Sequence, residues 1–150
     1  EGVLRHEDST GQSGDIRPGS AQRLSAGTGV RHSERNGSDD EPLVFVQMML
    51  RSDHDGDPEY AQTEVDQVPG VLVPTVKVHA PAELFAVRLE AGKRVTVPPS
   101  PRSLVIVTDG VVELGGEMLQ TGDEARFAVA GGYELATDAE ASALVWQLRR

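Results

Sequence analysis

The stretch "LVIVTDGVVELGG", residues 104–116, contains two short apolar runs separated by an Asp-Gly pair. Both runs are rich in valine and have the length of a β-strand, and an Asp-Gly pair favours a tight turn. The stretch therefore predicts a strand, a turn at Asp109–Gly110 and a second strand that ends at Gly115.

The same pattern of short apolar runs and turn residues continues on both sides of this stretch. Apolar runs of about four to eight residues, each closed by Gly, Pro or Asp, recur at a spacing of roughly ten residues, which is typical of a β-sandwich or barrel. We therefore predict an all-β fold. The expected strands are "PTVKVHA" (74–80), "AELFAVRLEAG" (82–92), "RVTVPP" (94–99), "SLVIVTDG" (103–110), "VVELGG" (111–116), "EARFAVAGG" (124–132), "YELAT" (133–137) and "ASALVWQL" (141–148).

The first third of the chain shows a similar pattern. Strands are expected in "EGVLRHED" (1–8) and, on either side of a Gly-Thr-Gly turn, in "AQRLSA" (21–26) and "GVRHSE" (29–34). The run "PLVFVQMML" (42–50) predicts the strongest strand of this half, and its length suggests burial on both faces. Only "DPEYAQTEVDQV" (57–68) has helical character.

Charge is concentrated in one segment of the chain. The net charge is −10, and residues 39–66 hold nine acidic side chains against a single basic one, Arg51. Such a run is typical of a solvated linker, and the lack of a basic stretch argues against binding to nucleic acid. The chain has no cysteine, so disulfides and thiolate metal sites are excluded.

No targeting or membrane-spanning segment is visible. No apolar run approaches the ~18 residues that a membrane span needs, and no signal peptide opens the sequence. We therefore expect a cytoplasmic protein. The sequence starts at Glu1, in what looks like a strand already under way, and we interpret it as a portion of a longer protein.

His32 and Glu34 are the strongest candidates for a metal site. Side chains two positions apart on a strand point to the same face, so an imidazole and a carboxylate can converge there on one cation. Such donors suit Fe, Mn, Ni or Cu. Metal-binding atoms sharing one ion should lie about 3–6 Å apart.

The stretch "GDIRPGSAQRLSAGTGVRHSERN" (14–36) resembles the second conserved motif of the cupins, in the form found in the pirin family. "HEDSTG" (6–11) and "DPEYAQ" (57–62) resemble two further pirin elements. The resemblance implies a bicupin, which has two jelly-roll barrels in one chain. Residues 1–50 would then be the C-terminal part of the metal-binding first cupin, 51–73 an acidic interdomain linker, and 74–150 a metal-free second cupin.

The resemblance also implies a ligand set. Pirin-like proteins hold one transition-metal ion with an H-x-H motif and a later His and Glu, to which His32 and Glu34 correspond. Iron is the first expectation, with Ni, Cu, Mn and Zn left open. The H-x-H would fall before Glu1, so we expect the first barrel to be incomplete and residues 1–150 alone to bind metal weakly or not at all.

Three functions remain open at this point. The first is an oxidoreductase of the quercetin 2,3-dioxygenase type, acting on a flavonol-like small molecule, with Glu34 as the base that takes the flavonol proton. The second is a non-enzymatic cupin whose metal state regulates binding to a protein partner. The third is an inactive truncated remnant.

The other three histidines are interpreted mainly as structural or exposed residues. His6 is expected on a half-exposed strand, with a role as a donor into the metal pocket as the alternative. His54 is expected to be exposed in the acidic loop, and His79 to lie on a strand where a neighbour satisfies it. The acidic spacing in 53–64 resembles a calcium loop, but Pro58 stands where that loop requires glycine.

Overall fold

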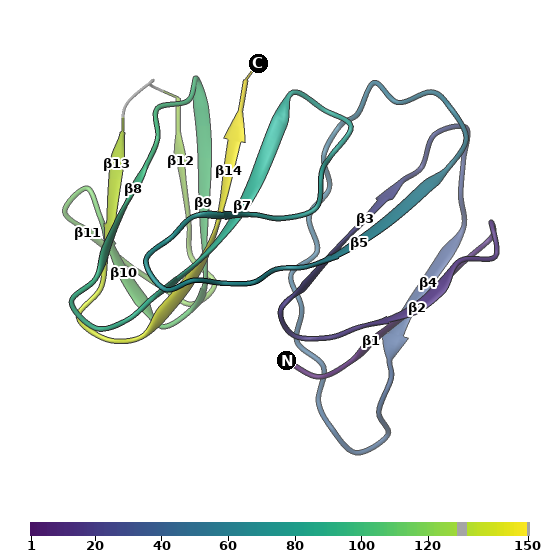
Figure 1. The fold of residues 1–150 in the computed structure, drawn as a ribbon, viewed down its shortest axis with the longest axis horizontal. Coiled ribbons are helices and arrows are strands. Elements are labelled where there is room, and N and C mark those ends of the chain that lie inside the picture. The colour runs from purple at the N-terminus through teal and green to yellow at the C-terminus, as the bar shows by residue number, and fades with distance from the viewer. Residues whose placement is uncertain (129–131, 150) are drawn as a thin grey trace. The chain divides into compact units, whose positions relative to one another are not determined.

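The computed structural model describes residues 1–128 and 132–149, which form strands and loops without a helix (Figure 1). The predicted all-β fold is confirmed. No helix among these residues could cross a membrane. The chain divides into two compact units: unit 1 comprises Glu1–Glu64 and Val76–Ala80, and unit 2 comprises Val65–Thr75 and Pro81–Arg150.

Unit 2 is built from two antiparallel sheets (Figure 1). The five-stranded sheet has the order β12-β9-β14-β7-β6, and the four-stranded sheet has the order β11-β10-β13-β8. The strands are β6 (Val73–Pro74), β7 (Ala82–Leu89), β8 (Arg94–Val97), β9 (Arg102–Asp109), β10 (Val111–Leu114), β11 (Glu117–Gln120), β12 (Glu124–Phe127), β13 (Tyr133–Ala136) and β14 (Ala141–Leu148).

The two sheets of unit 2 share one apolar core. Side chains alternate along a strand, so each strand contributes every second residue, as Val105 and Val107 do from β9. The opposite sheet supplies residues such as Val112 and Leu135, both fully buried. Because one cluster draws on both sheets, the sheets pack face to face as a sandwich.

The predicted turn at Asp109–Gly110 is present, with a different role from the one the sequence suggests. Gly110 has a φ of 73°, and a Cβ at this position would collide with the carbonyl oxygen of Glu140, so glycine is required. However, β9 pairs with β12 and β14, whereas β10 pairs with β11 and β13. The turn therefore carries the chain from one sheet to the other and does not close a hairpin.

Two other predictions for this half need correction or qualification, and one strand was missed. The run 74–80 does not form a strand beyond Pro74, because the register with β7 includes only Val73 and Pro74. Strand β11 was not predicted; its residues are mostly exposed, and pairing with β10 defines it. The run 124–132 is a strand only as far as Phe127, and its residues 129–131 lie outside the described part.

Unit 1 also contains two sheets, each smaller than those of unit 2. One has the order β2-β1-β4 and the other pairs β3 with β5. The strands predicted around residues 1–8, 21–26 and 29–34 are confirmed, and β2 is additional. The strands are β1 (Leu4–Asp8), β2 (Ser13–Ile16), β3 (Ser20–Ser25), β4 (His32–Asn36) and β5 (Glu59–Glu64).

The prediction of a buried strand at 42–50 is wrong. These residues form no regular strand, and the side chains of Val44, Phe45 and Met49 are largely exposed. The backbones of Glu1 and Val44 exchange two hydrogen bonds, of 2.9 and 3.0 Å. A strand needs a ladder on at least one edge, and this single bridge does not extend into one.

The segment with helical character, 57–68, instead provides β5. Its pairing with β3 sets Tyr60 opposite Leu24 and Glu59 opposite Ser25. Pairing with a neighbouring strand overrides a weak local preference for helix. The acidic stretch interpreted as a linker, 51–73, therefore supplies a strand to unit 1 between residues 59 and 64.

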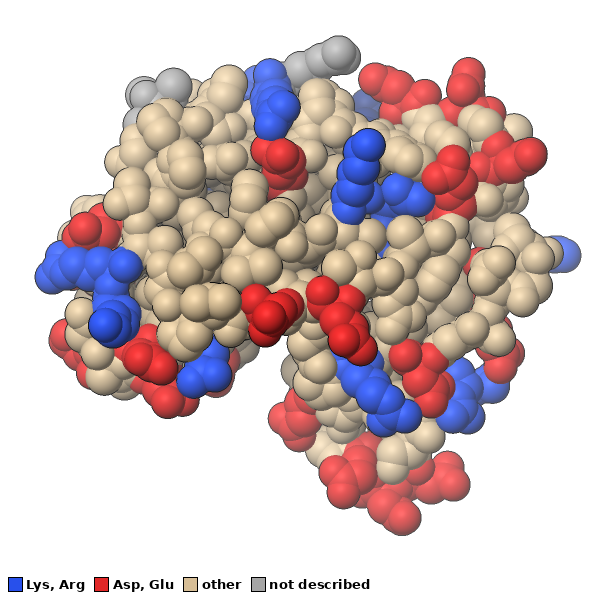
Figure 2. All heavy atoms as spheres, viewed as in Figure 1, with Lys and Arg blue, Asp and Glu red and all other residues tan. Residues whose placement is uncertain are grey.

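Charged side chains are mixed on the surface. Figure 2 shows basic side chains close to acidic ones on both units, and ion pairs such as Arg35–Glu7 and Arg94–Glu134, each 2.6 Å long, are of this kind. Among the described residues on the face drawn, basic side chains form no continuous band.

Candidate functional site

His32 and Glu34 both lie on β4, an edge strand that pairs with the central strand β1 of the three-stranded sheet. In the register of this pair His32 lies opposite Asp8 and Glu34 lies opposite His6. Residues directly opposite each other share a face of the sheet, and so do residues two apart on one strand. One face of β1 and β4 therefore presents two imidazoles and two carboxylates.

His6 is at the centre of this face. Its side chain is 1% exposed, which corrects the expectation of a half-exposed histidine. Its ring stacks with the rings of His32, 5.7 Å away, and Tyr60, 4.8 Å away. Its Nδ1 atom lies 3.8 Å from Oε1 of Glu34. Because both His32 and Glu34 contact the same ring, they gather on one side of β4.

The state of the His6 ring follows from its neighbour Asp8. The pKa of Asp8 is lowered to about 2, first by the hydrogen bond from the Thr10 hydroxyl and further by the backbone N–H of Thr10 and by His6. An ionised carboxylate only accepts hydrogen bonds, so Nε2 of His6 donates to Oδ2 of Asp8 over 3.3 Å. In a neutral ring Nδ1 then carries a lone pair.

That Nδ1 atom is buried and has no hydrogen-bond partner among the described residues. The lone pair faces a carboxylate oxygen, which is also an acceptor, so neither atom satisfies the other. A proton or a metal cation between them would satisfy both. The donors on this face thus fit a cation, although His32 and Glu34 supply only two of the four protein ligands that the resemblance implies.

Two amides hold the carboxylate of Glu34. The side chain of Gln22 donates to Oε1, and that of Gln47 donates to Oε2 over 3.2 Å. Tyr60 lies over this face. Burial is the main cause that raises the pKa of its phenol, and the negative charges of Glu34 and Asp8 raise it further. An open hollow of about 300 Å³ adjoins His32.

Sequence reasoning gave His6 a role at this site only as an alternative, and it missed Asp8. The spacing of the two residues was a usable signal, since His6-x-Asp8 repeats the two-residue spacing of His32-x-Glu34 on another predicted strand. The burial of His6 had no such signal. It arises because the ring of Tyr60, from β5 of the other sheet, packs against the ring of His6.

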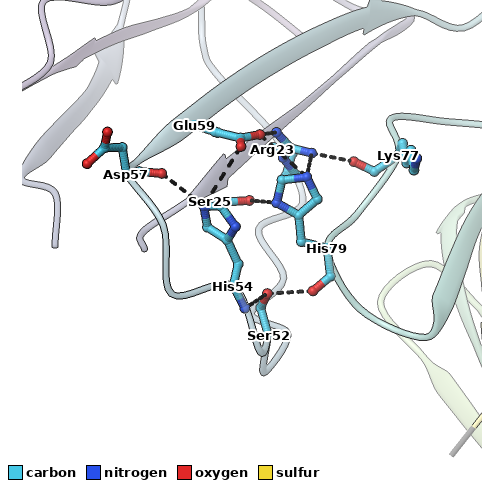
Figure 3. A network of polar contacts seen from close by, with 8 residues as sticks. All are labelled: Arg23, Ser25, Ser52, His54, Asp57, Glu59, Lys77 and His79. Carbon is cyan, nitrogen blue, oxygen red and sulfur yellow. Dashed lines mark hydrogen bonds and ion pairs between the residues drawn. The ribbon is translucent and has the colours of Figure 1, made fainter. Parts of the chain in front are cut away.

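A second group of potential ligands lies elsewhere in unit 1: His54, Glu59 and His79 (Figure 3). One ligand atom from each can be chosen so that all three atoms lie within 4.8 Å of one another. His54 comes from the loop before β5, and Glu59 is the first residue of β5. His79 comes from the segment Val76–Ala80. The structure therefore brings together two histidines that the sequence analysis had treated separately.

Both of these histidines depart from their predicted environments. The side chain of His54 is 16% exposed, not open to solvent, and its Nε2 lies 2.9 Å from the carbonyl oxygen of Asp57. His79 lies in a loop and not on a strand, between Arg23 and Ser25. No spacing rule could have found this group, because its three members come from separate segments.

Comparisons with known proteins match two family models to different parts of the chain. The family model described as Pirin matches residues 1–50, and the model described as Quercetinase C-terminal cupin domain matches residues 74–148. The chain is 30% identical to a quercetin 2,3-dioxygenase of Escherichia coli K12, over 99% of this chain and 69% of the relative.

A protein of Mycobacterium tuberculosis H37Rv, named as a candidate quercetin 2,3-dioxygenase, is 38% identical over 98% of this chain. The chain spans 66% of that relative's length. Among solved structures, YhhW from Escherichia coli matches with a TM-score of 0.90 at 27% identity, over 99% of this chain and 68% of that one. A second structure, of bacterial pirin YhhW in complex with nickel(II), matches with a TM-score of 0.76 at 23% identity, over 99% and 69%.

Proposed function

The chain belongs to the pirin family, and on that premise we propose that the full-length protein carries out a metal-dependent oxidation of the quercetin 2,3-dioxygenase type. His32 and Glu34 would be two ligands of one transition-metal ion, with iron the first expectation. The observation that carries the proposal is the face shared by β1 and β4, where the unpartnered Nδ1 of His6 lies 3.8 Å from the Glu34 carboxylate.

A bound metal would polarise the hydroxyl and carbonyl oxygens of a flavonol and so lower the pKa of its hydroxyl group. Glu34 would receive this proton. The Gln22 and Gln47 amides hold its two oxygens and so restrict its orientation. When one of these hydrogen bonds is released, that oxygen becomes free to accept a proton as a general base.

Asp8 and His6 are positioning residues that hold the ligand residues in place. Because Asp8 is ionised and accepts from Nε2, the His6 ring keeps one orientation and presents Nδ1 toward Glu34. Partners of this kind fix the geometry of metal ligands in proteins.

The proposal predicts distinct effects for the two ligand residues. In the full-length protein, His32→Ala should lower the metal content after purification, because water does not replace an imidazole ligand without a large loss of affinity. Glu34→Gln should lower quercetin oxidation per bound metal by about 10²–10⁴-fold, because it removes the base. Metal content would be measured by mass spectrometry and turnover by oxygen consumption.

Glu64→Gln, an exposed carboxylate on β5, is the matched control and should change neither quantity. If Glu34→Gln oxidises quercetin as fast as the wild type at equal metal content, Glu34 is not the base. If His32→Ala keeps its full metal content, the ligand assignment is wrong.

A non-enzymatic, metal-dependent regulatory role is the second candidate, and one observation favours it. Gln47, which contacts Glu34, lies in the same segment as the exposed apolar side chains of Val44, Phe45 and Met49. A metal that recruits Glu34 would release Gln47 and so alter this surface. Stoichiometric metal without oxidation of any flavonol would support this role over the enzyme.

A further inference from the structure

We propose that His54, Glu59 and His79 form a second metal site, separate from His32 and Glu34, for a divalent cation of the zinc or nickel type. Two imidazoles and one carboxylate are a donor set that such cations take, with water completing the coordination. All three residues belong to unit 1, and Figure 3 shows their side chains turned toward one another.

The distances between the donor atoms suit a shared ion. Nε2 of His79 lies 3.4 Å from Oε2 of Glu59, and Nε2 of His54 lies 3.9 Å from Oε1 of the same carboxylate. Ligands about 2.1 Å from a tetrahedral ion lie ~3.4 Å from each other. The two imidazole rings are 4.6 Å apart. Nε2 of His54 donates to the carbonyl oxygen of Asp57 over 2.9 Å, since a carbonyl only accepts, so metal binding through this atom would break that hydrogen bond and move the ring proton to Nδ1.

The hydrogen bonds around His79 favour the tautomer that a metal requires. Nη1 of Arg23 lies 3.1 Å from Nε2 of His79, and a guanidinium can only donate, so Nε2 carries the lone pair. The proton is then on Nδ1, which lies 3.4 Å from the hydroxyl of the buried Ser25. A metal-bound histidine characteristically donates its other ring N–H to such a partner.

Arg23 occupies the position that a metal would take. Its guanidinium also donates to Oε2 of Glu59 over 3.1 Å, so it supplies the positive charge that the cluster needs without metal. A third hydrogen bond, of 3.0 Å, runs from Nη1 to the carbonyl oxygen of Lys77, away from the ligands. A cation can therefore displace Arg23 from His79 and Glu59 while this anchor remains.

The site is partly open to solvent, as exchange of an ion requires. The side chain of Glu59 is 49% exposed, and that of His79 is 28% exposed. A bound cation would connect the loop before β5, the start of β5 and the segment Val76–Ala80. We therefore expect the metal to stabilise unit 1 against unfolding.

Zn(II) is the probe for the test, with affinity measured by competition against a chromophoric chelator in purified protein. His79→Gln and Glu59→Gln should each weaken this binding by at least ~10–100-fold, since even partners of metal ligands contribute that much. Glu59→Gln keeps an oxygen that can accept from Arg23, so its fold should persist. Glu64→Gln, on the same strand, is the matched control and should bind as the wild type does.

Arg23→Gln separates a metal site from a purely structural cluster. Removing the competing cation should tighten Zn(II) binding, whereas a structural cluster would only lose stability. Co(II) should give the absorption bands of a tetrahedral histidine-bound ion in the wild type, and these should disappear in His79→Gln.

His32→Ala distinguishes this site from the one proposed above and should leave the zinc affinity of the His54, Glu59 and His79 site unchanged. Zinc affinity that is unaffected by both His79→Gln and Glu59→Gln, in variants whose circular dichroism matches the wild type, would overturn the proposal. Loss of all zinc binding in His32→Ala would overturn it equally.

Discussion

The two units of this chain are stabilised in different ways. Unit 2 buries apolar side chains between two sheets, and residues such as Val105 and Leu135 have no exposed surface. Unit 1 buries fewer apolar residues, including Leu4 and Ile16, and it also buries an ionisable side chain, His6, whereas the buried polar side chains described in unit 2 are hydroxyl groups. Burial of apolar surface is favourable without regard to direction, whereas a buried polar group requires a partner in a particular place.

The distribution of histidine follows the same division. All four histidines of the chain lie in unit 1, and each takes part in one of its two ligand groups. The stability of unit 2 should therefore depend mainly on side-chain volume, whereas the stability of unit 1 should depend mainly on protons and metal ions. Three substitutions test this contrast.

Leu135→Ala is expected to have the largest effect on stability. The side chain is fully buried in the core of unit 2, and truncating such a leucine costs about 2–5 kcal/mol because a cavity remains. Denaturant unfolding followed by circular dichroism would measure this change. Met118→Ala, whose side chain is 63% exposed, is the control and should shift the free energy of unfolding by no more than ~0.5 kcal/mol.

Asp8→Asn should have a smaller effect that depends on pH. The pKa of Asp8 falls from its ordinary value of 3.8 to about 2 on folding, so the ionised group stabilises the folded state above about pH 4. That stabilisation is lost as the pH falls through 4 toward 2. The variant should therefore be less stable than the wild type at pH 7, and the difference should shrink below pH 4.

Unfolding curves at pH 7, 4 and 2.5 would measure this difference. A gap between Asp8→Asn and the wild type that stays constant across the three pH values would contradict the role assigned to the ionised carboxylate.

Met49→Ser should have the smallest effect. This side chain is fully exposed, and a surface substitution without partners changes stability by no more than ~0.5 kcal/mol. Thermal unfolding of the isolated protein is the measurement. A loss of more than 1 kcal/mol in the free energy of unfolding is typical of substitutions at buried positions. Such a loss would show that the segment 42–50 packs against other residues in solution.

Local pattern in the sequence was sufficient for much of the fold. Alternation of side chains, together with Gly, Pro and Asp at the ends of the apolar runs, predicted seven of the nine strands that the structure describes in unit 2. Of β6 only Pro74 lies in a predicted run, and β11 was missed. It also placed His32 and Glu34 on the same strand, because a spacing of two residues depends only on backbone geometry. The pirin resemblance rested on residues within such local stretches, and it is confirmed.

The same reasoning failed where the outcome depends on a distant partner. The run 42–50 has strong strand character, but the described residues offer it a bridge at Glu1 and no ladder. The segment 57–68 became partly a strand because β3 lies beside it. The turn at Gly110 depends only on the local sequence. Pairing with β11–β14 determines which sheet each of its two flanking strands joins.

The sequence by itself determined that this protein is an all-β member of the pirin family and that His32 and Glu34 share a strand, since these properties follow from local period and motif. Only the tertiary structure decided that His6 is buried between them and that His54, Glu59 and His79 meet. The reason is that side chains from separate segments come together only when strand pairing and packing bring those segments together.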